Sequence, residues 1–334
     1  MAVATPIDNV VVRLAKPEDY EAVLNIDKTI YSGLDIIPTM YHQYLNDPNR
    51  SLFVMDVDKK VVAFTMYQFV DEGKTAVVQA ARISPKLRSS GIFNHIGNQA
   101  FDMMREAHPK VIRVRLTSAY KRMILAKMMK GTWKTDLILE RPFIDGYLIP
   151  GKHEAVKSLS WSPSVQKVDL KRGMSILFDP DNQWKLFPQR KIILSLEVFD
   201  LSTANLNFIG PLCENVLVSF EPRSNANNCS TISLGKHFKI FLGIRYNIDV
   251  YSLDVQEAYD HIFYQLNLAL QYYKEGTICF MIVLPASFPR QEMLEQIHKL
   301  LPVNTDSLHN LGQSVCLFEQ NLLTHSSLRA PAKL

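Results

Sequence analysis

The stretch ISPKLRSSGIF, residues 83–93, joins a strand-like pattern to a helical one, and it decides the fold. Before it, Thr75–Ile83 is short, apolar and rich in valine, which is typical of a buried strand. After it, apolar residues recur at helical spacing from Gly91 to Ala107. The first N–H groups of a helix have no partner within it and lie at the positive end of its dipole. The small residues Ser89 to Gly91 let a phosphate approach such groups, and Arg88 adds a positive charge.

An ordinary serine-capped helix start is the alternative interpretation of this turn, and from the residues alone it is the commoner one. Pro85 has no backbone N–H, so it helps to keep the end of the strand from pairing further. An unpaired strand edge can receive an extended ligand. The residues therefore allow an anion site at the turn without requiring one.

The remaining sequence alternates between strand and helix patterns, which indicates an α/β protein with a mixed sheet. Before the turn we expect a strand, two helices and a β-hairpin, at Asn9–Leu14, Ala15–Asp27, Pro38–Asp47 and Ser51–Val70. After Ala107 we expect strands at Val111–Thr117, Trp133–Glu140, Lys191–Val198, Val216–Phe220, Phe238–Ile244, Thr277–Leu284 and Val315–Leu322. We expect helices at Tyr120–Lys130, Leu253–Tyr273 and Arg290–Leu301.

A chain of 334 residues has room for two domains, at roughly 150 residues each. Serine, proline and glycine interrupt the pattern at 149–190, which we interpret as a linker or interdomain wrap. It separates an N-terminal domain at 8–148 from a smaller C-terminal domain at 191–325. The order of elements from Tyr246 to Leu322 repeats that from Thr75 to Glu140, which indicates a second, related half without the glycine-containing turn.

Composition narrows the function classes. The chain is 47% hydrophobic and 21% charged, which excludes a disordered protein. No apolar run approaches the ~20 residues of a membrane span, and an evenly spread net charge of +4 does not favour a nucleic-acid partner. The N-terminal residues show no signal peptide, and the four cysteines have no CxxC spacing. We therefore expect a cytoplasmic protein with reduced core thiols and no metal, whose oligomeric state the sequence leaves open.

The turn resembles the pyrophosphate-binding signature of the GNAT N-acetyltransferases, an aliphatic-x-Pro start followed by Arg/Gln-x-x-Gly-x-Gly/Ala. Ile83, Pro85, Arg88 and Gly91 carry this resemblance. Other segments resemble the vertebrate histidine N-acetyltransferase family, namely Ile30–His42, Leu45–Arg50, Arg115–Thr117 and Tyr246–Asp249. The resemblance implies a GNAT-like α+β fold, with a mixed central sheet flanked by helices and a second, smaller GNAT-like half.

The same resemblance implies an enzyme that transfers acetyl from acetyl-CoA to the α-amine of a small amino acid, with histidine as the leading acceptor. The implied cofactor-binding residues hold the pantetheine arm and the pyrophosphate, and they are Ala81, Ile83, Arg88, Ser89, Ser90, Gly91, Ile92 and Phe93. Tyr31, Asp35 and Tyr41 lie in the segment implied to line the acceptor side. An Asx-type turn after Gly33 is the alternative role of Asp35.

Proton transfer is where the sequence departs from the family. Gln79 stands where the family has an acidic residue, and an amide can orient a water but cannot accept a proton. Phe93 stands where the family keeps a small residue. We name Gln79, His95 and Tyr120 as the catalytic candidates, His95 as a proton relay and Tyr120 as an acid placed one turn early.

Three interpretations of the function follow. The first is the small-molecule acetyltransferase. The second is a CoA-binding protein or scaffold that has lost catalysis, which Gln79 and Phe93 favour, and the third acetylates peptide amines. Asp249 is interpreted as a solvated surface residue, with a place on the acceptor side as its alternative.

Overall fold

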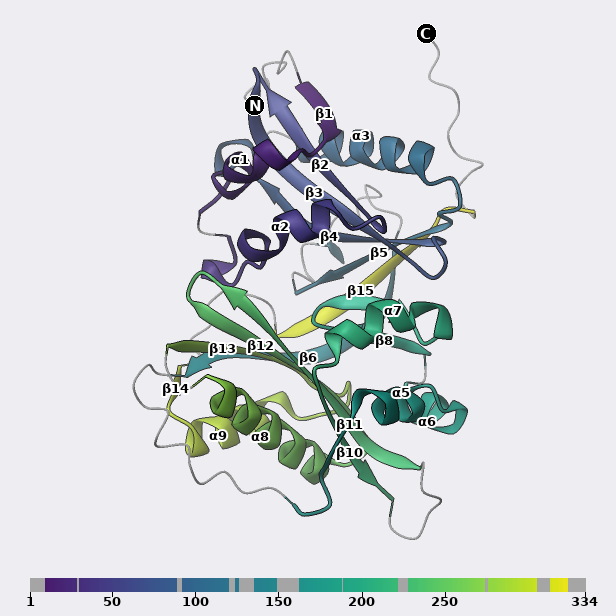
Figure 1. Ribbon diagram of the computed structural model, residues 1–334, viewed down its shortest axis with the longest axis vertical. Coiled ribbons are helices and arrows are strands. Elements are labelled where there is room, and N and C mark those ends of the chain that lie inside the picture. Colours follow the sequence, from purple (N-terminus) through teal and green to yellow (C-terminus); the bar gives the residue numbers. More distant parts are fainter. Residues whose placement is uncertain are drawn as a thin grey trace. The chain divides into compact units, whose positions relative to one another are not determined.

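The computed structural model describes residues 10–28, 30–88, 92–119, 124–125, 135–148, 162–187, 189–221, 228–273, 276–304 and 313–323 (Figure 1). The chain forms two compact units. Unit 1 comprises Met1–Leu116 with Glu319–Leu334, and unit 2 comprises Thr117–Phe318. The last described strand therefore brings the chain back to unit 1 after unit 2 is complete.

Unit 1 is built on a mixed sheet in the order β1-β2-β3-β4-β5, with β4 and β5 parallel and the other pairs antiparallel. Its strands are β1 (Val10–Leu14), β2 (Arg50–Val57), β3 (Lys60–Val70), β4 (Thr75–Ile83) and β5 (Arg113–Ser118). Its helices are α1 (Tyr20–Leu24), α2 (Ile37–Leu45) and α3 (Ile92–Ala107), with 3₁₀ turns η1 (Pro17–Asp19), η2 (Ile30–Gly33) and η3 (Pro85–Leu87).

Helices cover both faces of the unit 1 sheet because side chains alternate along each strand. Leu52 and Val54 of β2 pack with Ile37 and Tyr41 of α2 in one apolar cluster. Phe53, between them, faces the other way and packs in the cluster that includes Ala100 and Met104 of α3. The position of α3 is thus fixed by the apolar stripe that the sequence predicted.

The strands of unit 2 follow the order β15-β6-β13-β12-β11-β10-β7, and β8 pairs with β9 in a separate two-stranded sheet. Its strands are β6 (Asp136–Leu148), β7 (Gln166–Val168), β8 (Lys191–Leu194), β9 (Glu197–Asp200), β10 (Asn215–Phe220), β11 (Cys229–Ile240), β12 (Gly243–Ser252), β13 (Thr277–Val283), β14 (Val303–Asn304) and β15 (Ser314–Asn321). Its helices are α5 (Leu170–Leu177), α6 (Pro180–Leu186), α7 (Leu206–Ile209), α8 (Val255–Tyr272) and α9 (Arg290–Leu300), with 3₁₀ turns η5 (Thr203–Asn205) and η6 (Gly210–Leu212).

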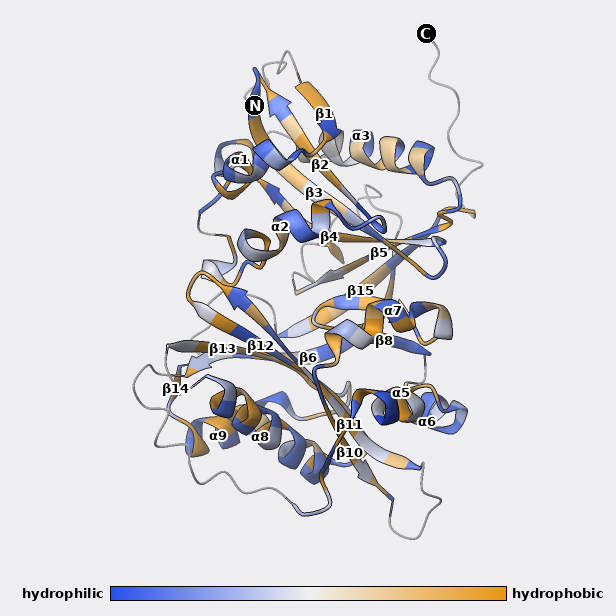
Figure 2. Ribbon diagram, viewed as in Figure 1, coloured by the Kyte–Doolittle hydropathy of each residue, from blue (hydrophilic) through white to orange (hydrophobic). Residues whose placement is uncertain are grey.

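The helices α8 and α9 pack on one face of the unit 2 sheet. Ile262 and Leu266 of α8 and Met293 of α9 share an apolar cluster with β12 and β13. Hydrophobic and hydrophilic residues both occur along α8, as its amphipathic packing requires (Figure 2). This arrangement leaves the opposite face of β12 turned away from α8 and α9.

A strand–helix–parallel strand motif occurs in both units. In unit 1, α3 connects β4 to the parallel strand β5, and in unit 2, α8 connects β12 to the parallel strand β13. The first three elements of the predicted five-element repeat are therefore confirmed, while the fourth element of unit 1, the helix at Tyr120–Lys130, lies outside the described residues except for 124–125. In unit 2 the carboxylate of Asp254 accepts a hydrogen bond from Glu257 N at 2.8 Å and caps the start of α8.

Two strand predictions in unit 2 are wrong. Lys191–Val198 is a hairpin rather than one strand, because it turns at Ser195 and Leu196, which have φ of 53° and 71°. Phe238–Ile244 also spans a turn, at the exposed Phe241 and Leu242. The two turns consist of Ser195-Leu196 and Phe241-Leu242, so neither pair contains the Gly, Asn or Pro signal that marks most hairpins.

Part of the predicted linker at 149–190 belongs to unit 2 as helices. Asp169 caps α5 by accepting from Arg172 N, and Asp179 caps α6 immediately before Pro180. These Asp and Asp-Pro signals are typical of helix starts, and the scattered serines and prolines obscured them. The boundaries of the compact units differ from those predicted for the two domains, 8–148 and 191–325. The predicted division into two domains with separate functions stays a proposal.

Most other element predictions are confirmed within the described residues, including β4 and α8. The predicted helix at Tyr120–Lys130 lies outside the described residues except for 124–125, which are helical. The four cysteines are buried in the core, as the sequence predicted.

Candidate functional site

A β-bulge interrupts β4 close to the predicted turn. The β3–β4 register passes from Met66 opposite Gln79 to Phe64 opposite Arg82, so Thr65 alone lies opposite two residues, Ala80 and Ala81. Ala80 has φ of 52°, a left-handed conformation that is unfavourable for residues other than glycine. The sequence gives no sign of this bulge, because the residue that adopts it is an alanine.

The bulge marks the point where β4 leaves its parallel neighbour. The β4–β5 register runs from Thr75 opposite Arg113 to Val78 opposite Leu116 and then ends. In the described part of the chain, no strand register covers this edge of β4 beyond Val78. The main chain of Ala81 and Ile83, predicted to pair with the pantetheine arm, lies on the edge that is left.

The half-buried side chain of Gln79 is fixed by two neighbours at the start of the bulge. Arg50 Nη1 donates to Gln79 Oε1 at 2.6 Å, and Gln79 Nε2 donates to Gln68 Oε1 at 3.0 Å. Arg50 is held in turn by Asp47, at 3.1 Å, and lies over the ring of Tyr44. Sequence analysis missed Arg50 and Gln68, since only the strand register brings them beside Gln79.

The predicted pyrophosphate turn is only partly within the described residues. Ser89, Ser90 and Gly91 lie outside them. The helix α3 begins at Ile92, and the side chains of Ile92, Phe93 and His95 are not described. Tyr120 also lies outside the described residues.

Lys86 and Arg88 are described charged residues of the turn, and Arg88 is nearer to α3 in the sequence. The Arg88 side chain is 53% exposed and forms an ion pair with the buried carboxylate of Asp27. About half of the Arg88 side chain thus remains open to solvent.

Asp35, predicted on the acceptor side, is engaged in a buried ion pair. Its carboxylate accepts two hydrogen bonds from Arg82, at 2.7 and 3.1 Å, and the Arg82 side chain is 1% exposed. Asp35 Oδ1 also accepts from Ile37 N at 3.1 Å, which confirms the alternative Asx-type role. The described partners of this carboxylate therefore lie within unit 1, and its place on the acceptor side stays a prediction.

Tyr41 and Tyr31, the other predicted acceptor residues, differ in their surroundings. Tyr41 is fully buried, its hydroxyl donates to Lys16 O at 2.7 Å, and burial raises its pKa to about 12. Tyr31 is half-buried in η2 with φ of 50°. Of the two, Tyr31 is the one with surface that an acceptor can contact.

Asp249 is not the solvated surface residue that the sequence analysis preferred. It is 2% exposed on β12, where Ser195 N donates to its Oδ2 at 2.8 Å. Burial raises its pKa to about 7. The pattern around it, Tyr246 to Asp249, alternates large apolar and polar residues, which does not reveal that both faces of β12 are covered.

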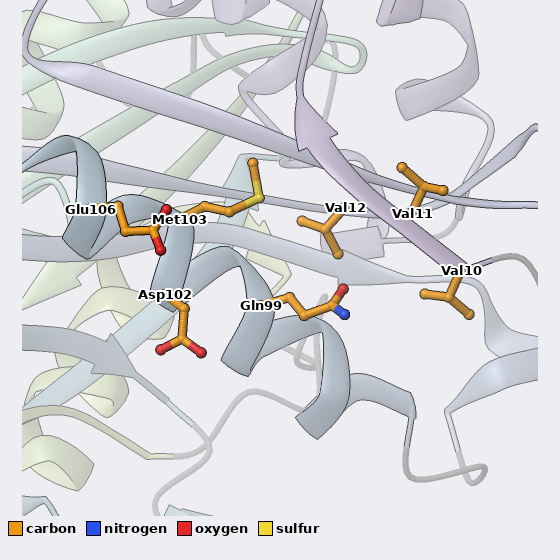
Figure 3. Close-up of a pocket in the computed structure, with 7 residues that line it drawn as sticks. All are labelled: Val10, Val11, Val12, Gln99, Asp102, Met103 and Glu106. Atoms are coloured by element: carbon orange, nitrogen blue, oxygen red, sulfur yellow. The ribbon is translucent and has the colours of Figure 1, made fainter. Parts of the chain in front are cut away.

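A groove of about 370 Å³ lies between β1 and α3 (Figure 3). Val10 and Val12 of β1 line one side, while Gln99 and Met103 extend from α3 toward that strand. The carboxylates of Asp102 and Glu106 belong to its lining, so its charge has the same sign as that of a phosphate. This groove is unsuited to the nucleotide end of CoA.

No cluster of three or more His, Cys, Asp or Glu side chains that suits a metal ion occurs among the described residues. Within the same residues, no helix combines the length and apolarity needed to cross a bilayer.

Comparison with known sequences gives consistent results. The C-terminal region of the histidine N-acetyltransferase family matches residues 160–284. A histidine N-acetyltransferase of Oreochromis niloticus is 24% identical over 305 residues, which cover 87% of this chain and 88% of that protein. A probable N-acetyltransferase 16 of Homo sapiens is 34% identical over 116 residues, 35% of this chain and 31% of that protein.

Two solved structures share the fold over nearly the whole chain. A GCN5-related N-acetyltransferase from Sphaerobacter thermophilus has a TM-score of 0.55 at 9% identity, covering 95% of this chain and 97% of that one. A tandem GNAT protein from the clavulanic acid biosynthesis pathway also has a TM-score of 0.55 at 9% identity, covering 94% and 99%. The predicted GNAT fold with two related halves is confirmed.

Proposed function

We propose that this chain, a divergent relative of the histidine N-acetyltransferases with a tandem GNAT fold, transfers the acetyl group of acetyl-CoA to the amine of a free amino acid, with histidine as the leading acceptor. The observation that carries the proposal is the edge of β4 released by the bulge at Ala80 and Ala81, immediately before the turn into α3. The similarity to histidine N-acetyltransferases over 87% of the chain supports this activity and this acceptor.

Acetyl-CoA suits this edge as a substrate. The amide groups of its pantetheine arm can pair with the main chain of Ala81 and Ile83 as an added strand does. The start of α3 offers N–H donors and the positive end of a helix dipole to the pyrophosphate. The open part of the Arg88 guanidinium adds a positive charge beside it.

In the reaction, the amine nitrogen attacks the thioester carbon, a C–N bond forms and the C–S bond breaks. The amine loses a proton and the leaving thiolate gains one. Attack requires a neutral amine, yet an α-amino group with a pKa of about 8 is mostly protonated at pH 7. Gln79 cannot accept that proton, which leaves water or the relay candidate His95 to take it, and the rate is expected to rise with pH until the amine is neutral.

An assay of thiol release with purified chain, acetyl-CoA and a panel of free amino acids tests the proposal. Release with histidine, with N-acetylhistidine as the product, is the expected result. Tight CoA binding without release would favour the second candidate, a CoA-binding protein without catalysis. The hydrogen bonds that tie both ends of the Gln79 amide to Arg50 and Gln68 are the observation behind that candidate.

Replacing Gln79 with glutamate is expected to raise kcat/KM for histidine at pH 7 by about tenfold or more, a change worth ~1.4 kcal/mol in the barrier. Arg50 lies 2.6 Å from Gln79 Oε1, so its charge keeps the new carboxylate ionised and available for a proton. Rates are measured as thiol release between pH 6 and 9.

Gln99→Glu on α3 is the matched control, because it adds the same charge to unit 1 away from the bulge. An unchanged rate in Gln79→Glu, with a fold as stable as that of the original chain, would mean that proton removal at this position does not limit the reaction.

Replacing Arg88 with glutamine is expected to weaken CoA binding by about five- to tenfold, since a charge-assisted contact is lost at a solvent-exposed place. The loss should shrink in high salt, because salt screens exposed charges. Calorimetric titration with CoA at low and high salt measures both effects. Lys86→Gln, an exposed residue of η3, serves as the control, and an equal loss in both variants would indicate only general attraction.

A further inference from the structure

The helices α8 and α9 lie on one side of β12 (Figure 1). The opposite face of β12 carries three polar residues at alternate positions, Arg245, Asn247 and Asp249. Alternate residues of a strand point to opposite faces, so these three share one face, while the residues between them pack in the core under α8 and α9. None of the three is more than 7% exposed. Polar residues of this kind are rarely buried without partners.

Neighbouring strands extend this face. The registers place Asn247 beside Met281 of β13, and Met281 beside Asp145 of β6, which is 6% exposed. Residues that lie opposite each other in a sheet share a face, so Asp145 belongs with Asn247. We call Asp145, Ser195, Arg245, Asn247 and Asp249 the β12 polar face; it combines one guanidinium, one amide, one hydroxyl and two carboxylates.

Several buried polar atoms of the β12 polar face have no hydrogen-bond partner among the described residues. They are Nδ2 and Oδ1 of Asn247, Oδ1 of Asp249 and Oγ of Ser195. The other face of the same strand is different, because the hydroxyl of Tyr246 bonds to Asn215 at 3.0 Å and to Gln265 at 2.7 Å. Buried polar atoms normally form hydrogen bonds, so we expect a polar ligand to bind at this cluster.

The turn of the β8–β9 hairpin is held at this face in a strained conformation. Ser195 N donates to Asp249 Oδ2 at 2.8 Å, and Thr117 Oγ1 donates to Leu196 O at 2.5 Å. Ser195 and Leu196 are both left-handed although neither is glycine. Strained backbone that persists in this way is found preferentially at ligand sites.

We propose that the β12 polar face binds a small zwitterion of the amino-acid class. Its carboxylate interacts with Arg245 and the Asn247 amide N–H, and its ammonium interacts with Asp249, Asp145 and the Asn247 amide oxygen. An anion alone would face two carboxylates, and a cation alone would face the guanidinium, whereas a zwitterion complements both charges. The choice of histidine as the probe rests on the proposed function.

Calorimetric titration of free L-histidine into the full chain, with and without CoA, tests the site in the absence of turnover. Asn247→Leu has nearly the same size and replaces the unpartnered amide by an apolar group, so the fold should tolerate it. This variant is expected to bind histidine at least about tenfold more weakly and CoA equally well. Asn228→Leu is the control, because its amide donates to Glu221 at the end of β11 away from this face.

Two ligands that each lack one charge test the zwitterion. Histamine, which has no carboxylate, and imidazolepropionate, which has no ammonium, should each bind at least about tenfold more weakly than histidine. Histidine affinity within twofold of the original in Asn247→Leu, equal affinity for histamine, or no histidine binding with or without CoA would each overturn the proposal.

These outcomes separate the site from the activity. If Asn247→Leu releases thiol with an unchanged KM for histidine, the proposed binding site is rejected and the proposed acetyltransferase activity stands. If the chain binds histidine in a manner that depends on Asn247 but releases no thiol, the proposed binding site stands and the proposed acetyltransferase activity is rejected.

Discussion

Replacing Asp35 with alanine is expected to lower the free energy of unfolding by about 3–5 kcal/mol, because it leaves the Arg82 guanidinium buried without its counter-charge. The two side chains are 11% and 1% exposed and share two hydrogen bonds, so water cannot replace the lost carboxylate. Urea unfolding, followed by fluorescence, measures the change as a lower midpoint.

A double-mutant cycle with Arg82→Ala isolates the pair. The double variant should lose less stability than the two single variants together, because it no longer buries a lone charge. Lys74→Ala provides the control, since its ion pair with Glu72 is largely exposed and its removal should leave the midpoint in place. An Asp35→Ala chain that unfolds like the original but has a raised KM for the amine would instead assign the carboxylate to the acceptor.

Replacing Asp249 with asparagine is expected to stabilise the chain above pH 7 and to remove part of its pH dependence. Burial, the largest effect, raises the pKa of Asp249 from 3.8 to about 7, against the opposing effects of the Ser195 N–H and the charges of Arg141 and Arg245. Asparagine keeps an acceptor for Ser195 N and carries no charge to bury.

The sign of the pH effect follows from the two pKa values. Between pH 3.8 and about 7 the folded chain holds a proton on Asp249 that the unfolded chain has released. Stability from this group is therefore complete below pH 3.8, falls as the pH rises to about 7, and is constant above. The difference corresponds to at most about 4 kcal/mol, the upper limit for the gain of Asp249→Asn at pH 8.

Urea midpoints of the original chain and Asp249→Asn between pH 4 and 8 check this expectation, which requires the two curves to meet at low pH. Asp136→Asn, an exposed aspartate of unit 2, should follow the original chain throughout. Parallel curves for Asp249→Asn and the original would show that the carboxylate titrates alike in the folded and unfolded chains.

Local patterns predicted much of the fold. The valines of Thr75–Ile83, the apolar stripe after Gly91 and the long stripe of α8 each indicate one element within a few residues, because period and burial agree there. The turn at Ser195 was missed because its backbone is held by a contact with Asp249 rather than by turn residues. The turn at Phe241 was missed because two apolar residues, Phe241 and Leu242, occupy it although they are exposed.

The candidate site was predicted only where it depends on local patterns in the sequence. The position of Gln79, Ala81 and Ile83 before the α3 turn follows from the order of elements along the chain. Their neighbours do not, because Arg50 reaches Gln79 only through the registers of β2, β3 and β4. The burial of Asp249 likewise depends on which residues cover the second face of β12, and the sequence of that one strand carries no information about them.

The return of the chain to unit 1 has a consequence for its synthesis. Glu319 bonds to Arg115, and Leu322 N donates to Ile112 O, so residues translated after unit 2 complete a unit begun before it. Residues 117–318 separate the two, and a ribosome takes roughly 10–40 s to translate them at 5–20 residues per second. Throughout that interval the nascent N-terminal portion has an unfinished sheet edge beside Arg115, which makes this stage of translation the one at which chaperones have most to protect.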